Sequence, residues 1–204
     1  MRTLFISILI GLSFLRLPAF AQGFTNKADA TNKLVEGKKD GKWLEYLDNY
    51  TLETNDMKEA KYYSLTVYKA GAYNGTRSVY YLSGKLFYKT IWVNNKLTDK
   101  VEKMYYESGQ LMSEEALANG QPNGLHKQYY ETGILQAETP YTNGKMNGLW
   151  KQYYASGKLK REIPMVNGLE DGEDKEYYES GQLKSKTVYT NDKPGVKENY
   201  NDNR

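Results

Sequence analysis

The residues that could carry out chemistry are few, and their spacing predicts no catalytic site. The chain of 204 residues contains one histidine, His126, and no cysteine. His126 therefore has no second imidazole or thiol with which to build a nucleophilic pair or a zinc site. It occupies the same repeat position as Trp43 and Trp150. We interpret it as a structural residue on an apolar face of a strand.

Acidic residues recur at Glu107, Glu131 and Glu179, but each lies beside a predicted turn. Side chains at turns are mostly solvated, so these carboxylates do not form a candidate acid–base pair. Further predicted turns contain Asp40, Asp171 and Asp192. Their spacing does not fit a calcium loop. We therefore expect a protein that is not an enzyme, with no catalytic residues, no cofactor and no metal.

Tyrosine is the residue whose repetition could serve recognition. The chain has 20 tyrosines, and pairs of adjacent tyrosines recur in steps of 24 or 25 residues. The first members of these pairs are Tyr80, Tyr105, Tyr129, Tyr153 and Tyr177. An exposed row of such rings suits contact with a protein or a glycan, because each ring offers an apolar body and a polar hydroxyl. We predict this row as a candidate partner-binding strip. The alternative interpretation is that the rings form the core of a thin sheet.

The tyrosine pairs belong to a repeated unit, which is clearest between Gly124 and Gly148. A fixed period of about 24 residues is typical of a repeat array. Each unit has two turn signals, a Ser/Thr-Gly pair such as Ser156-Gly157 and an Asn-Gly pair such as Asn143-Gly144. The segments between the turns are short, rich in Tyr, Leu, Thr and Val, and lack helical periodicity. One unit is therefore predicted to be one β-hairpin.

About six to seven such units predict an all-β fold, an elongated antiparallel β-meander of about twelve to fourteen strands. A sheet with that many strands must twist and curl, so we expect a curled single-layer sheet. Its stability should be roughly a sum of contributions from repeats and their neighbours.

The charge pattern favours one strand register across the Ser156-Gly157 turn. A two-residue turn there predicts the pairs Tyr154–Leu159, Tyr153–Lys160, Gln152–Arg161, Lys151–Glu162 and Trp150–Ile163. The same arithmetic predicts the pairs Lys127–Glu138 and Lys103–Glu114. Opposite charges across a strand pair stabilise a sheet. A three-residue turn with a glycine bulge is the alternative. Two other copies pair less well, with Lys175 opposite Lys186 and Ser78 opposite Lys89.

Under this register the second tyrosine of each pair shares a face with a leucine. We predict a structural role for these residues and for the turn glycines: Tyr106, Tyr130, Tyr154, Tyr178, Leu111, Leu135, Leu159, Leu183, Gly109, Gly133, Gly157 and Gly181.

The N-terminal part of the chain does not follow the repeat. Residues 1–21 have a basic start, a short apolar run and an Ala-x-Ala site, which predicts a signal peptide cleaved between Ala21 and Gln22. Residues 22–36 are small and polar, which predicts a flexible leader. The repeat domain is expected over 37–204, with an irregular insertion at about 49–61.

These features predict a secreted or periplasmic protein. The absence of cysteine excludes disulfides and the lipidated cysteine of a lipoprotein. Of the 28 basic residues, Arg2 and Arg16 lie in the predicted signal peptide, which leaves 26 basic against 25 acidic residues. A charge so close to balance does not suggest binding to nucleic acid. No integral membrane association is expected after cleavage.

Residues 129–148 nearly match the unit Tyr-Tyr-x-x-Gly-x-Leu-x-x-Glu-x-x-Tyr-x-Asn-Gly-Lys-x-x-Gly. In this the chain resembles the MORN-repeat family in its bacterial variant, over about residues 37–200. The resemblance implies hairpin repeats that serve as interaction or scaffolding surfaces. Bacterial relatives are often labelled antitoxin components of toxin–antitoxin modules, whereas this chain has a predicted secretory leader.

Three hypotheses for function follow. The first is a non-enzymatic scaffold that binds a protein partner through the face of its sheet. The second is an antitoxin or immunity-type protein that neutralises a toxin by direct binding. The third is a binder of glycans or the cell wall that uses the tyrosine strip.

Overall fold

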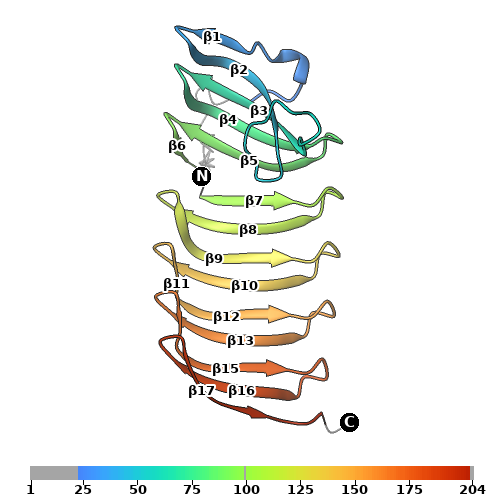
Figure 1. Ribbon diagram of the computed structural model, residues 1–204, viewed down its shortest axis with the longest axis vertical. Helices are drawn as coiled ribbons and strands as arrows, with labels where there is room; N and C mark the ends of the chain where they lie inside the picture. Colours follow the sequence, from blue (N-terminus) through green and yellow to red (C-terminus); the bar gives the residue numbers. More distant parts are fainter. Residues whose placement is uncertain (1–22, 99, 203–204) are drawn as a thin grey trace, which may run out of the picture.

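The repeats form one continuous antiparallel sheet (Figure 1). The computed structural model describes residues 23–98 and 100–202, so the predicted signal peptide lies outside the described residues. The strands are β1 Lys33–Val35, β2 Lys38–Leu47, β3 Tyr62–Lys69, β4 Ala72–Tyr81, β5 Leu86–Val93, β6 Lys96–Leu97, β7 Val101–Tyr105, β8 Leu111–Ala118, β9 Gln121–Tyr129, β10 Leu135–Thr142, β11 Lys145–Met146, β12 Gly148–Tyr153, β13 Leu159–Val166, β14 Leu169–Glu170, β15 Gly172–Tyr177, β16 Leu183–Thr190 and β17 Lys193–Asn199. A short 3-10 helix, η2 Lys27–Asp29, precedes them.

The predicted meander is confirmed. Strands pair with their neighbours in sequence order, and the stack runs from β1 at one end to β17 at the other (Figure 1). Strands β6, β11 and β14 are short leading segments of β7, β12 and β15, because each pair of segments lies against the same neighbouring strand. Counted this way, the 17 described strands form 14 rows. The sheet is an elongated, open, single layer.

The Asn-Gly signals form two-residue turns that lie along one side of the stack, where the strands end. Both Asn143 and Gly144 have positive φ, 50° and 78°, which is the geometry of a type I′ hairpin turn. Asparagine and glycine tolerate this conformation at little cost. The turn also ties adjacent repeats together, since the Gly144 N–H donates to the Pro122 carbonyl at 2.8 Å.

The Ser/Thr-Gly signals form the turns at the other ends of the strands. Here the predicted turn length is wrong. The Gly157 N–H donates to the Tyr154 carbonyl, and the Tyr154 N–H donates to the Lys158 carbonyl, both at 2.8 Å. Gly157 has φ 83°, so the loop is a three-residue turn that ends in a glycine bulge. Tyr153 therefore lies opposite Leu159, and the predicted pairs Tyr154–Leu159 and Tyr153–Lys160 do not form.

A second bulge restores the predicted register further along the strands. It leaves Lys160 without a partner in the ladder between β12 and β13. Beyond the bulge, the structure contains the predicted pairs Gln152–Arg161, Lys151–Glu162, Trp150–Ile163, Lys127–Glu138 and Lys103–Glu114. The less favourable pairs Lys175–Lys186 and Ser78–Lys89 are also present.

The two faces of the sheet differ in composition. We call one the ladder face, because it carries the alternating charges Lys103, Glu114, Lys127, Glu138, Lys151 and Glu162. We call the other the mixed face; it carries His126, Thr139, Trp150, Ile163 and Asp174. On the mixed face Thr139, Ile163 and Asp174 are buried, whereas the charged residues of the ladder face are half-buried or exposed.

Both faces are covered at the N-terminal end of the array. The segment predicted as a flexible leader instead packs on the ladder face, where Phe24 is buried against Tyr63 and Leu65. The Asn32 side chain further anchors it, accepting a hydrogen bond from the Leu44 N–H at 2.9 Å. The insertion between β2 and β3 folds back on β2, with Ala60 buried.

Candidate interaction surface

The ladder face repeats one arrangement of a lysine, a glutamate and a tyrosine. At three successive junctions a glutamate lies opposite a lysine of the following strand: Glu114–Lys127, Glu138–Lys151 and Glu162–Lys175. The tyrosine two residues after each lysine donates its hydroxyl to the same glutamate. These hydrogen bonds are Tyr129–Glu114 at 3.0 Å, Tyr153–Glu138 at 3.0 Å and Tyr177–Glu162 at 2.8 Å. Each glutamate therefore has both a cationic neighbour and a hydroxyl donor.

The tyrosines of the predicted partner-binding strip are part of this arrangement. The pKa of Tyr153 is raised to about 12. Partial burial is the larger cause, and the hydrogen bond to Glu138 is the second. Burial and the bond to Glu162 raise the pKa of Tyr177 to about 12 in the same way. A carboxylate that accepts a hydrogen bond from the phenol O–H disfavours the phenolate form, because the phenolate would be a second negative charge beside it. Tyr105, Tyr129, Tyr153 and Tyr177 are half-buried, so only part of each side chain is accessible to a partner.

Tyr80, the remaining member of the predicted strip, lies at the covered end. Its ring stacks on that of Tyr63, with centroids 5.1 Å apart, and packs against the cluster around Phe24. The Lys27 ammonium lies 3.6 Å from the centroid of Tyr63. The N-terminal segment thus occupies the ladder face at β2–β4, and Tyr80 is separated from the other four by this packing.

Beside the charged ladder, the ladder face carries apolar side chains that the chain does not cover. Val101, Leu125, Leu149 and Val188 are 47%, 39%, 40% and 47% exposed. Pro140 lies opposite Leu125, and Pro164 lies opposite Leu149. A row of aliphatic side chains next to a row of charges is typical of an interface, where apolar contacts supply affinity and charges supply register.

The second tyrosine of each pair links one repeat to the next. The hydroxyls of Tyr106, Tyr130, Tyr154 and Tyr178 donate to the backbone carbonyls of Tyr129, Tyr153, Tyr177 and Tyr200 at 2.7–3.0 Å. The predicted leucine partners lie elsewhere, since Leu111, Leu135, Leu159 and Leu183 pair with the first tyrosines of each pair. The glycines Gly109, Gly133, Gly157 and Gly181 all have positive φ.

Two pairs of titratable side chains lie on the mixed face. His126 lies beside Glu115, with Nδ1 and Oε1 3.7 Å apart. Arg161 makes a bidentate contact with Asp174, at 2.9 and 2.8 Å. Hydrogen bonding to Asp174 raises the pKa of Arg161 against the opposing effect of desolvation. The bidentate pair thus holds the charges of Arg161 and Asp174 within the face.

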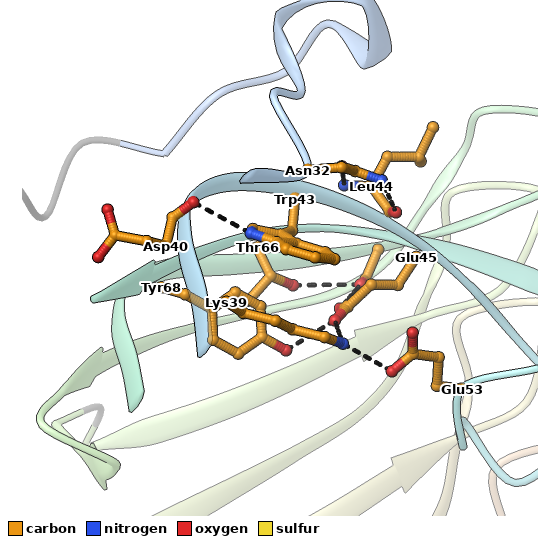
Figure 2. A network of polar contacts seen from close by, with 10 residues as sticks. Asn32, Lys39, Asp40, Trp43, Leu44, Glu45, Glu53, Thr66 and Tyr68 are labelled. Carbon is orange, nitrogen blue, oxygen red and sulfur yellow. Dashed lines mark hydrogen bonds and ion pairs between the residues drawn. The ribbon is translucent and has the colours of Figure 1, made fainter. Parts of the chain in front are cut away.

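Sequence reasoning missed a buried carboxylate, Glu45, which lies 5% exposed on β2 (Figure 2). Lys39 and Tyr68 donate to its Oε1 at 2.7 Å, and Ser64 donates to its Oε2 at 2.8 Å. Lys39 also contacts Glu53 of the insertion at 2.7 Å. Burial opposes the charged form of Glu45, but these hydrogen bonds outweigh it and hold its pKa below the ordinary value. The signal in the sequence was a charged residue two positions after Trp43, on the buried side of β2.

This network does not build a catalytic site. A carboxylate whose oxygens already accept three hydrogen bonds, and whose pKa is lowered, is a weak general base. Within residues 23–98 and 100–202, no group of three or more His, Cys, Asp or Glu side chains could hold a metal ion. Over the same residues, no helix has the length and apolar composition needed to span a bilayer.

Comparison with known proteins agrees with the architecture. The MORN repeat variant matches the chain five times, at residues 73–94, 98–116, 122–143, 146–167 and 170–191, which together make up just over half of it. No curated protein matches the chain. Repeats of this kind generally form scaffold modules for interaction with proteins or membranes. The chain therefore belongs to the MORN repeat variant family.

Proposed function

We propose that this protein is a non-enzymatic scaffold that binds a protein partner through the ladder face of β7–β16, outside the inner membrane. The observation that carries the proposal is the uncovered row formed by Val101, Leu125, Leu149 and Val188 beside the charged ladder. Covering one such partly exposed aliphatic side chain is worth about 1 kcal/mol. Several of them in one row can support a specific interface.

The chain itself provides a precedent on the same face. At β2–β4 the N-terminal segment lies across the ladder face and buries Phe24 against Tyr63 and Leu65. The uncovered part offers a continuation of that surface, with Leu125 and Leu149 on strands β9 and β12. A partner segment with apolar residues can use it in the same way.

The test is affinity capture from an envelope fraction with the mature chain as bait. We expect the double variant Leu125→Glu with Leu149→Glu to lose the captured protein, because it places charges in the apolar row. The matched control, Gln128→Glu with Gln152→Glu, makes the same charge change on the mixed face and should retain it. Thermal melts of both variants check that the fold is intact. Equal capture by the two variants would refute the proposed surface.

The same experiment separates the related functions. An antitoxin role uses the same direct binding, and the captured partner would then be a toxin. A role in glycan or cell-wall binding predicts instead that the chain sediments with peptidoglycan, and that Tyr129→Ala and Tyr153→Ala abolish this. Recovery of the chain in the periplasm or medium, with Gln22 as its N-terminal residue, tests the proposed localisation.

A further inference from the structure

The lysine–glutamate–tyrosine arrangement of the ladder face changes at the junction of β5 and β7. It also changes at the junction of β16 and β17, where Lys186 has the glutamate position but lies opposite Glu198. At the junction of β5 and β7, Tyr88 lies opposite Met104, as Ala137 lies opposite Gln152 at a regular junction. The next position in register is occupied by Lys89 on β5 and by Lys103 on β7. At the regular junction the corresponding residues are Glu138 and Lys151. A lysine thus stands where the repeat has a glutamate.

The ladder between β5 and β7 stops at this point. Its only regular pair in the described chain is Tyr88–Met104, whereas the β10–β12 and β13–β15 ladders continue through the Glu–Lys pair. Like charges directly opposite one another disfavour strand pairing, although the Lys175–Lys186 pair of β15 and β16 lies within a continuous ladder. On its other side, Lys89 faces Ser78 of β4, so neither neighbouring strand places a carboxylate opposite it.

A cavity of about 300 Å³ lies at this junction on the ladder face. It is lined by Leu86, Lys89, Ile91, Val101, Lys103 and Tyr105. Lys89 is exposed. The Lys103 ammonium lies 3.5 Å from the carboxylate of Glu114 on β8, the strand on the side of β7 away from β5. The lining therefore combines two lysines and a tyrosine with three aliphatic residues. This volume can admit one or two side chains of a partner.

We propose that this cavity receives an acidic side chain of the protein partner. Its carboxylate would lie between Lys89, Lys103 and the Tyr105 hydroxyl, as Glu138 lies beside Lys151 and the Tyr153 hydroxyl within the array. Apolar residues next to the acid would contact Leu86, Ile91 and Val101. This inference rests on the proposed function and specifies the chemistry of the partner: an acidic residue flanked by aliphatic ones.

The substitution Lys89→Glu separates binding from folding. It supplies the missing carboxylate from within the chain, so it should raise the thermal midpoint by about 2 °C while blocking an acidic ligand. A merely structural lysine would not show these opposite effects. Lys145→Glu makes the same charge change at an exposed position of β11, away from the cavity, and it should alter neither property.

The binding test uses two blocked peptides, acetyl-Leu-Glu-Val-amide and acetyl-Leu-Gln-Val-amide, titrated into labelled full-length mature chain and followed by NMR. We expect the Glu peptide to shift the amides of residues lining the cavity. Binding should be about tenfold weaker for the Gln peptide, and about tenfold weaker for the Glu peptide with the Lys89→Glu variant. Free acetate should shift the same amides more weakly, since it lacks the aliphatic contacts.

Equal binding of the two peptides, or no shift at the cavity, would overturn the inference. If both peptides shift only residues around Leu125 and Leu149, the proposed interaction face keeps its support and the carboxylate site is wrong. If neither peptide shifts any residue, the carboxylate site is again wrong, and affinity capture with the ladder-face variants decides the proposed function separately.

Discussion

The hydroxyl of Tyr130 donates a hydrogen bond of 2.8 Å to the backbone carbonyl of Tyr153, the first tyrosine of the next repeat. The same bond recurs between the neighbouring repeats, from Tyr106 to Tyr129 and from Tyr154 to Tyr177. A single-layer sheet has no central core, so its stability depends on such contacts between neighbours. The second tyrosine of each pair is therefore a coupling residue.

Removing one of these hydroxyls should weaken the array. We expect Tyr130→Phe to lower the free energy of unfolding by about 1 kcal/mol, since it keeps the ring and removes the hydrogen bond. Tyr50→Phe is the control, because Tyr50 is 82% exposed in the insertion and should change stability very little. Urea denaturation measures both, and equal effects would contradict the coupling role.

The glycine bulge at the three-residue turn can be tested at Gly157. A β-carbon there has room, since its nearest neighbour would be the Ile134 side chain at 3.7 Å. The cost of substitution therefore comes from the backbone, which has φ 83°. We expect Gly157→Ala to destabilise the chain by about 1 kcal/mol, and Gly157→Asn by less, because asparagine tolerates positive φ. The order of the two melting temperatures is the measurement.

The tyrosine–glutamate hydrogen bonds predict that some phenol groups titrate at unusually high pH. Partial burial and the bond to Glu138 raise the pKa of Tyr153 to about 12. The raised pKa stabilises the fold below the unfolded value of about 10, and this contribution disappears as pH rises through the folded value. Glu138→Gln should move the titration of one tyrosine toward 10 in an ultraviolet absorbance experiment. An unchanged curve would show that the bond does not form in solution.

The lowered pKa of Glu45 predicts how the free energy of unfolding depends on pH in the acidic range. Burial disfavours its charge, but hydrogen bonds from Lys39, Tyr68 and Ser64 lower its pKa below the ordinary value. A lowered pKa gives stability that is present above the unfolded value, about 4.3, and is lost as pH falls through the folded value. Glu45→Gln should cost about 2 kcal/mol at pH 7. The difference from wild type should shrink between pH 5 and pH 3, and a constant difference would contradict the prediction.

The sequence was sufficient to predict the meander because the turns are local. Asn143-Gly144 and Gly157 mark backbone conformations that few other residues adopt, and they recur with the repeat. The register near Gly157 was harder. A three-residue turn followed by the bulge at Lys160 gives the same charge pairs as a two-residue turn, so Lys151 opposite Glu162 cannot distinguish the two.

The residues that sequence reasoning missed depend on contacts between distant segments. Phe24 is a lone aromatic residue in a polar stretch. It packs against Tyr63 and Leu65 of β3, which are far from it in the sequence. Glu45 has no counterpart in the later repeats, and its donors include Tyr68 and Lys39 from two different strands. Periodicity carries no information about such positions.

The most direct test of the proposed interaction face is site-specific photo-crosslinking in cells. A photoreactive benzoylphenylalanine is placed at Leu149 on the ladder face, or at Trp150 on the mixed face, one residue away on the same strand. We expect the Leu149 position to yield a crosslink to a second polypeptide and the Trp150 position to yield none. A crosslink from Trp150 alone would show that the partner binds the other face.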